Sequence, residues 1–116
     1  MSGYLLFICE AVHDREALLE YWRGLEAALE GQEAEQVIAY GPFDRLEGVG
    51  DVAGVHLLRF PTFDAAKTWH QSAAHEAIKP LAQRGGKFLC AVLEAGRWPD
   101  PKDRMPHTVG RSRANA

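Results

Sequence analysis

Four apolar runs, separated by helical patterns and one glycine-rich loop, constrain the fold of this chain more than any other feature. The runs contain many strand-forming residues and occupy positions 4–12, 35–43, 55–61 and 87–95. Their side chains are apolar at consecutive positions, which is typical of strands that are covered on both faces. The sequence therefore predicts a sheet with packing partners on both sides.

Helical patterns lie between the first two runs and between the last two. The first begins after Asp14, a suitable N-cap, and stops at Gly31, with apolar residues at helical spacing between them. The second begins near Thr62 or Asp64, and its expected core stripe is Ala66, Trp69 and Ala73.

Ser72 could interrupt the second helix. The segment SAAHE, which this serine opens, resembles a fresh N-cap with an acidic residue in the first turn. The helical region then ends at Gly85 and Gly86.

The resulting order is strand, helix, strand, strand, helix, strand, which is the βαββαβ arrangement of the ferredoxin-like fold. Right-handed crossovers would place two helices on one face of a four-stranded antiparallel sheet. We therefore expect one α+β, ferredoxin-like domain over residues 1–96, which suits a chain of 116 residues. Residues 97–116 are rich in proline and arginine and poor in aliphatics, so an irregular tail is expected there.

The second face of such a sheet would be bare in a single chain. Because all four runs are apolar on both sides, the simplest cover is the sheet of a second copy. We therefore expect a homodimer that pairs through its sheet faces.

Charge and cysteine content argue against several classes of protein. The formal net charge is -3 and the isoelectric point about 5.9, which disfavours nucleic-acid binding by the whole domain. No apolar run approaches the ~18 residues of a membrane span, and residues 1–10 lack the basic start of a signal peptide. A reducing cytoplasm is the expected location, with Cys9 and Cys90 as buried free thiols.

Three segments of the sequence resemble one known family. They are LEG at residues 46–48, the strand ending FPT at residues 60–62, and AAKTWHQSAAH at residues 65–75. The family, domain of unknown function 1330, has a strand ending F-P-S followed by A-A-x-x-W-Y-x-S-x-x-Y. Its members are similar to the dimeric α/β-barrel superfamily, so the resemblance, which extends from Tyr4 to Ala95, implies that fold and a dimer.

Two positions depart from the family pattern in a way that bears on chemistry. His70 and His75 stand where the family has tyrosines, so imidazoles replace both phenols. This disfavours an activity that needs a phenol at those positions and favours one that needs a base near neutral pH. The wider superfamily includes cofactor-free oxygenases, isomerases and haem-degrading enzymes, and that likeness implies the fold alone.

His70 and His75 are candidates for general acid–base catalysis. On one continuous helix they would lie about 140° apart and would not share a face, whereas a break at Ser72 would allow them to meet. The alternative is one surface histidine and one packed histidine. No CxxC, HExxH or acidic cluster accompanies them, so no metal ligands are expected.

The remaining candidate residues each have a structural alternative. Trp69 is either a core residue or the wall of a ligand cavity, and Ser72 is better explained as a cap than as a nucleophile. Arg59, which points away from His56, either clamps a substrate carboxylate or forms an interface salt bridge. Glu47 is either a general base or a turn residue.

These observations predict a small enzyme without metal, nucleotide or other cofactor. His70, His75 or Glu47 would transfer protons on a small, partly apolar molecule that could be anionic. The candidates for binding it are Trp69, Tyr40, Arg59 and Ser72. Isomerisation, hydration or dehydration, and cofactor-free oxygenation are all compatible with this site. A non-catalytic ligand-binding or structural dimer is the second hypothesis, and a haem-binding protein is the third.

Overall fold

The structure is a computed structural model that describes residues 1–96 and Lys102. The predicted irregular tail at residues 97–116, apart from Lys102, lies outside the described residues. None of the helices in the described part of the chain is long and apolar enough to cross a membrane.

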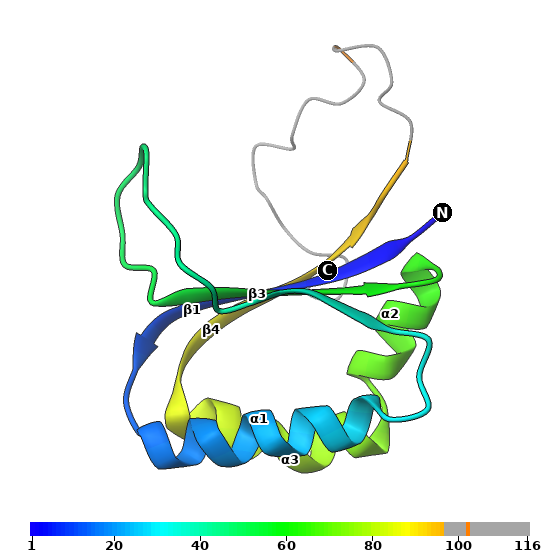
Figure 1. The fold of residues 1–116 in the computed structure, drawn as a ribbon, viewed down its shortest axis with the longest axis horizontal. Coiled ribbons are helices and arrows are strands. Elements are labelled where there is room, and N and C mark those ends of the chain that lie inside the picture. The colour runs from blue at the N-terminus through cyan, green and yellow to red at the C-terminus, as the bar shows by residue number, and fades with distance from the viewer. Residues whose placement is uncertain (97–101, 103–116) are drawn as a thin grey trace.

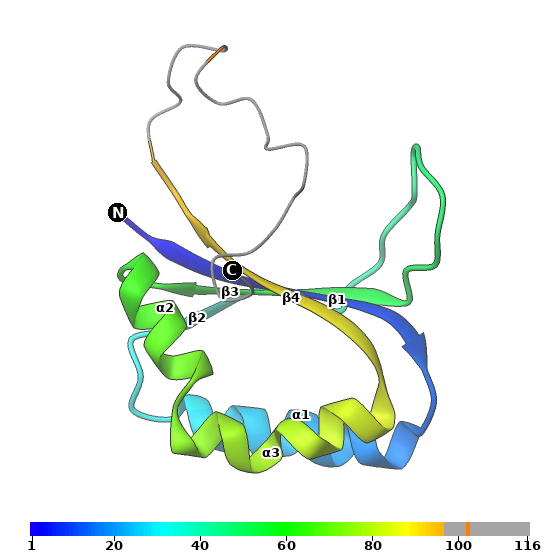
Figure 2. The same cartoon turned by 180° about the vertical axis from the view of Figure 1, so that it is seen from behind.

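Four strands form one antiparallel sheet in the order β2-β3-β1-β4, and the helices lie on one of its faces (Figures 1 and 2). In chain order the elements are β1 (Gly3–Val12), α1 (Arg15–Leu29), β2 (Glu35–Ala39), β3 (Gly54–Phe60), α2 (Phe63–His70), α3 (Ala73–Gly85) and β4 (Gly86–Glu94). This is the predicted ferredoxin-like arrangement, with three helices in place of two.

The third helix arises because the second helical pattern divides at Ser72. The Thr62 hydroxyl caps α2 by accepting a hydrogen bond from the Ala65 N–H at 3.0 Å. The Ser72 hydroxyl caps α3 in the same way, accepting from the His75 N–H at 3.3 Å. The interruption that Ser72 made possible is therefore present, and each half of the region has its own cap.

The first helix follows its prediction closely, whereas the second strand is shorter than predicted. The Asp14 side chain caps α1 by accepting from the Ala17 N–H at 3.2 Å. Strand β2 ends at Ala39 rather than at residue 43. The reason is Tyr40, whose φ of 58° lies in the left-handed region and turns the chain out of the sheet.

The core lies between the helices and the face of the sheet that they cover, here called the inner face. The strands contribute buried apolar side chains at alternate positions, and the helices cover them with a stripe of large residues. The principal members are Leu5, Phe7, Tyr21, Leu25, Leu58, Phe60 and Trp69. The prediction that Ala73 belongs to this core is wrong: α3 starts afresh at Ser72, which leaves Ala73 exposed and buries His75.

Helices α1 and α3 pack closely against one another beneath the sheet (Figure 2). Gly24 of α1 makes this approach possible. A Cβ atom at position 24 would lie 2.7 Å from Cγ2 of Ile78 on α3, which is closer than atoms can pack. Gly24 stands three residues after Tyr21, and Ile78 stands three residues after His75, so the contact is one helical turn from that pair.

The opposite face of the sheet, here called the outer face, is not covered by any of the described helices (Figures 1 and 2). Strand register places a set of apolar side chains on it. These include Tyr4, Leu6, Ile8, Leu57, Leu89 and Leu93, of which Leu89 and Leu93 are 49% and 45% exposed. The predicted two-sided apolar sheet is therefore present, and the described helices cover only one side of it.

Candidate functional site

A cavity of about 350 Å³ lies under the inner face at the β1–β4 side of the sheet. Its wall combines apolar side chains with a few polar groups from several elements, namely Phe7, Tyr21, His70, His75, Lys79 and Cys90. A mostly apolar cavity with a small number of convergent polar groups is typical of small-molecule sites. We call it the main cavity.

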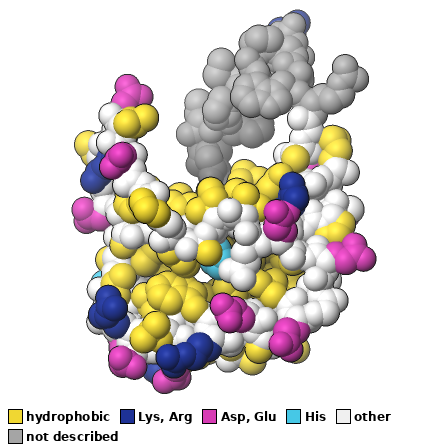
Figure 3. Space-filling view, in the orientation of Figure 1, with side chains coloured by type: hydrophobic (Ala, Val, Ile, Leu, Met, Phe, Trp, Pro, Cys, Tyr) yellow, Lys and Arg dark blue, Asp and Glu magenta, His cyan; other side chains and the backbone are white. Residues whose placement is uncertain are grey.

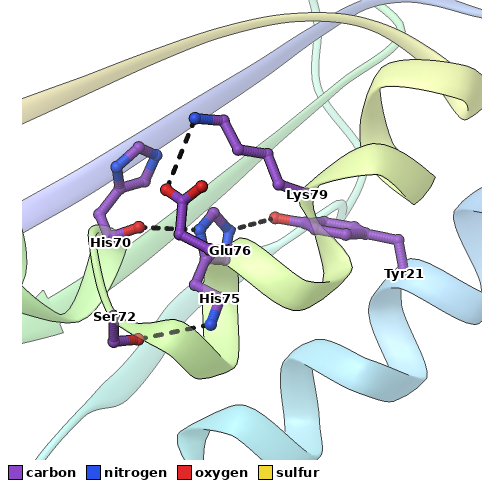
Figure 4. Close-up of polar contacts among 6 residues, drawn as sticks. All are labelled: Tyr21, His70, Ser72, His75, Glu76 and Lys79. Atoms are coloured by element: carbon purple, nitrogen blue, oxygen red, sulfur yellow. Dashed lines mark hydrogen bonds and ion pairs between the residues drawn. The ribbon is translucent and has the colours of Figure 1, made fainter.

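His75 is 2% exposed and has a hydrogen-bond partner on each ring nitrogen (Figure 4). Its Nδ1 lies 3.0 Å from the backbone carbonyl oxygen of His70. A carbonyl can only accept, so Nδ1 carries the proton and Nε2 is left as an acceptor. The Tyr21 hydroxyl, 3.0 Å from Nε2, therefore donates to it. The two hydrogen bonds fix both the tautomer and the ring orientation.

The Tyr21–His75 pair is uncharged at neutral pH. Burial lowers the pKa of His75, and the neighbouring His70 lowers it further. Burial likewise raises the pKa of Tyr21 well above its ordinary value. The phenol thus keeps its proton and points it at the imidazole, while its oxygen can still accept a hydrogen bond from a molecule in the cavity.

His70 also lines the main cavity and lies beside His75, with 4.8 Å between the two ring centroids. Its own ring nitrogens make no hydrogen bond within residues 1–96. Burial lowers the pKa of His70, the positive charge of Lys79 lowers it further, and Glu76 acts in the opposite direction. His70 is therefore a neutral imidazole at neutral pH, and its basic nitrogen has no hydrogen-bond donor among residues 1–96.

A charged pair stands at the edge of the same site. The ammonium of Lys79, which lines the cavity, lies 3.6 Å from a carboxylate oxygen of Glu76 (Figure 4). Both side chains are partly exposed, so the pair contributes little to stability. The pair thus places a positive charge at the edge of the main cavity.

Cys90 contributes a thiol to the cavity wall. Both cysteines are free thiols, as predicted, and Cys9 is buried. Cys90 was expected to be buried but is exposed to solvent, because it lies on the edge strand β4 beside the cavity. The dense surroundings of its sulfur nevertheless raise the pKa of the thiol to about 12. A thiol that holds its proton so firmly is a poor nucleophile at neutral pH.

Trp69 and Ser72 lie behind the main cavity rather than in its wall. The Trp69 indole belongs to the core, donates to the Ala28 carbonyl oxygen at 3.1 Å, and lies 4.9 Å from the His75 ring. Ser72 caps α3. Their contribution is to hold His75 in place.

Arg59 and Glu47 lie away from the main cavity. Arg59 is exposed on the outer face and forms an ion pair with Glu35 of the neighbouring strand, whereas His56 on the same strand is buried on the inner face. Glu47 lies in the loop between β2 and β3, which rises from the sheet on the side away from the helices (Figure 1). A single chain does not bring either residue to the histidines.

Tyr40 lines a second cavity of about 170 Å³ at the β2–β3 side of the inner face. In Figure 3 a hollow with a histidine at its floor opens between the sheet and the helices. Tyr40 stacks between Trp22 and His56, with ring centroids 4.9 Å and 5.1 Å away. Phe7 contacts His56 on one side and both His70 and His75 on the other, so its ring separates the two cavities.

Tyr21 is a candidate functional residue that the sequence analysis does not single out. It is one of the apolar residues at helical spacing that predict the first helix, and that spacing indicates only a core position. A buried tyrosine hydroxyl needs a hydrogen-bond partner, and that requirement was the available signal. The partner could not be named, because fifty-four residues separate Tyr21 from His75 along the chain.

Substitution of Ser72 by alanine is expected to lower the free energy of unfolding by about 1 kcal/mol, because α3 loses its cap. Urea denaturation followed by circular dichroism measures this loss. Ser2→Ala is the matched control, since the Ser2 side chain makes no hydrogen bond to the described residues. Equal stability of the two variants would contradict the capping role.

Comparisons with known proteins give a family and a fold. The sequence profile of the family described as Domain of unknown function (DUF1330) matches residues 2–95. A crystal structure of a protein of unknown function from Rhodopseudomonas palustris is similar at a TM-score of 0.64 and 16% identity, covering 83% of each chain. No curated protein sequence matches this chain.

Two other similar structures are described as dimers. A dimeric ferredoxin-like protein of unknown function from Jannaschia sp. CCS1 has a TM-score of 0.59 and 15% identity, covering 82% of this chain and 100% of the other. A dimeric protein of unknown function with a ferredoxin-like fold from Bacteroides fragilis has a TM-score of 0.50 and 14% identity, covering 81% and 96%. At such identities these likenesses support the fold alone.

Proposed function

The chain belongs to the family described as Domain of unknown function (DUF1330), and on that premise we propose that it is a small, cofactor-independent enzyme. It would transfer protons on a small, partly apolar molecule with an anionic end. The observation that carries the proposal is the neutral His70 imidazole, with its free nitrogen, beside the Tyr21–His75 pair in one cavity. Two adjacent groups able to exchange protons are what acid–base catalysis at neighbouring atoms requires.

The two groups would act on different atoms of the substrate. The neutral His70 imidazole would take a proton from a carbon next to a carbonyl group and become an imidazolium, and the electron pair of the broken C–H bond would pass to the carbonyl oxygen as an enolate. The Tyr21 hydroxyl, which donates to Nε2 of His75 in the structure, would turn to donate a hydrogen bond to that oxygen. The His70 imidazolium would then return a proton either to the carbon or to the oxygen, and His75, held by the His70 carbonyl, would stay neutral throughout. The site is thus suited to moving a proton between a carbon and the oxygen of the adjacent carbonyl, as in the interconversion of an enol and a ketone.

The shape and charge of the main cavity suit a particular class of substrate. A volume of about 350 Å³ is near the lower end for small-molecule sites, so the substrate is small. Phe7 and Phe88 supply flat apolar walls. Lys79 would pair with a carboxylate at the edge of the cavity, in place of its present partner Glu76.

Proton NMR in D₂O tests this function without knowledge of the natural substrate. A panel of small 2-oxo and 3-oxo carboxylic acids is incubated with the protein, and loss of the signal from the hydrogens next to the carbonyl is followed. We expect exchange faster than in buffer for at least part of the panel. Probes that bind, by their effect on the histidine signals, but exchange at the buffer rate would favour the alternative of a non-catalytic binding module.

Haem binding is less well supported by the residues present. Both ring nitrogens of His75 already have partners, so of the two histidines in the main cavity only His70 has a ring nitrogen without a hydrogen bond to residues 1–96. The main cavity is also small for a porphyrin. No step of the proposed chemistry uses haem.

A homodimer that pairs through the outer faces of its sheets is part of the proposal. The outer face carries exposed apolar side chains, including Leu89 and Leu93, and the described helices cover only the inner face. Dimers with the same fold among the similar structures support this arrangement. Pairing of two outer faces is isologous, so one patch suffices for both partners.

A further inference from the structure

The loop between β2 and β3, residues 40–53 and here called the arm, exposes apolar side chains to an unusual degree. Leu46 is 91% and Val49 101% exposed, and Phe43 is 47% exposed. Single apolar residues on a surface are common, but three gathered on one projecting loop form a contact surface without a partner in the chain that the structure describes.

The arm has a defined shape. Its two ends are fixed to the sheet, since the Tyr40 N–H donates to the Val55 carbonyl at 2.9 Å and the Ala53 N–H to the Cys9 carbonyl at 2.6 Å. Near the tip, the Arg45 side chain donates to the Gly50 carbonyl oxygen and closes the loop.

Glycine is required in this tip for its backbone conformation. Gly48 and Gly50 have φ values of 101° and 102°, in the left-handed region that other residues avoid. A Cβ at either position would meet nothing within 4 Å, so the space around them does not demand glycine. These two glycines therefore allow a specific turn, and in it Leu46 and Val49 project away from the rest of residues 1–96.

The direction of the arm indicates what it contacts. It rises from the sheet on the side opposite the helices, which is the side of the outer face (Figures 1 and 2). A second copy that pairs through that face would stand directly beside the arm. The apolar residues on the arm match the apolar outer face of such a partner, where Leu89 and Leu93 are half exposed.

We propose that the arm of each subunit packs its Leu46 and Val49 against the outer face of the partner's sheet, so that the two paired sheets are contacted by one arm from each subunit. The inference rests on the homodimer proposed above and adds to it a second contact region. By two-fold symmetry each arm contact occurs twice, so the loss of two side chains from the sequence removes four from the dimer.

Sedimentation velocity over a series of protein concentrations measures the dimer dissociation constant. The variant combines Leu46→Ser and Val49→Ser, and both side chains are so exposed that the fold of the subunit should be unchanged. We expect its dissociation constant to rise at least about tenfold above that of the wild type. Val12→Ser is the matched control, because Val12 is also apolar and 46% exposed but lies at the end of β1 next to the helices (Figure 1).

Two outcomes would overturn the inference, and they can be told apart. A wild-type dimer whose dissociation constant is unchanged in the arm variant would exclude the arm contact and leave the sheet pairing in place. A wild-type protein that remains monomeric at all concentrations would exclude the sheet pairing itself. In either case the proton-transfer function of the main cavity would be unaffected, because that cavity lies on the inner face.

Discussion

Replacing His70 by glutamine is expected to lower the rate of protein-catalysed hydrogen exchange by about 10²- to 10⁴-fold, which is the usual contribution of a general acid or base. Glutamine keeps a polar side chain of similar size but cannot take up a proton near neutral pH. The His70 ring nitrogens make no hydrogen bond within residues 1–96, so the change should leave the fold intact. Proton NMR in D₂O with the most active probe measures the effect.

The matched control for this substitution is His13→Gln. His13 is exposed in the turn before α1. Its backbone N–H donates to the Gly85 carbonyl oxygen at 2.7 Å, and its ring makes no hydrogen bond to residues 1–96. Its replacement should leave the exchange rate unchanged. If the His70 variant kept the wild-type rate while binding the probe equally well, another group would have to be the base, and the proposed mechanism would be wrong.

Acidification is expected to destabilise the protein through His56. This side chain is 3% exposed, and burial lowers its pKa from 6.5 to about 4. Between those values the unfolded chain binds the proton more readily than the folded one, so stability is lost as the pH falls through that window. The loss contributed by His56 should approach about 3 kcal/mol at pH 4 and be absent at pH 7 and above.

The surroundings of His56 determine the size of this loss. Its Nε2 lies 3.0 Å from the Gln36 side-chain oxygen, and Tyr40 and Glu26 line the same cavity. Of these groups only Glu26 carries a charge opposite to that of an imidazolium, and it is exposed to solvent. Protonation of His56 therefore places a charge in the core that no buried carboxylate among these groups balances.

Urea denaturation at several pH values tests this prediction. Other groups also titrate, and the pKa values of His70 and His75 are lowered in the same direction. The contribution of His56 is therefore the difference between the wild type and a His56→Gln variant, which cannot take up the proton. A variant whose stability falls with pH as steeply as that of the wild type would show that His56 is not the cause.

The fold could be predicted because the local signals in the sequence for strands, helix starts and helix ends are clear. Apolar runs, caps and glycine stops agree with one another, and the motif at Ser72 indicates where the second helix could divide into α2 and α3. The end of β2 was misplaced because nothing in the sequence indicates that Tyr40 adopts a left-handed conformation. Such a conformation depends on tertiary contacts, here with Trp22 and His56.

The site was predictable only in part. The sequence named both histidines but left open whether they share a cavity, because that depends on the angle between α2 and α3. The sequence analysis places Arg59 and Tyr40 in the same candidate site as the two histidines. Alternation along a strand shows which side chains share a face of the sheet, but it does not show which face the helices cover. The helices cover the face of His56, so Arg59 lies outside, and Phe7 places Tyr40 in a different cavity.

The close approach at Gly24 makes the proposed chemistry depend on the absence of a side chain at that position. An alanine there would suit an isolated helix better by about 1 kcal/mol. It would also act as a wedge against Ile78 and force α1 and α3 apart. Tyr21 and His75 sit one turn away on the same two helices, joined across 3.0 Å, and a hydrogen bond tolerates little stretching. Gly24 thus sets the distance between the Tyr21 hydroxyl and the His75 ring, although it belongs to neither group.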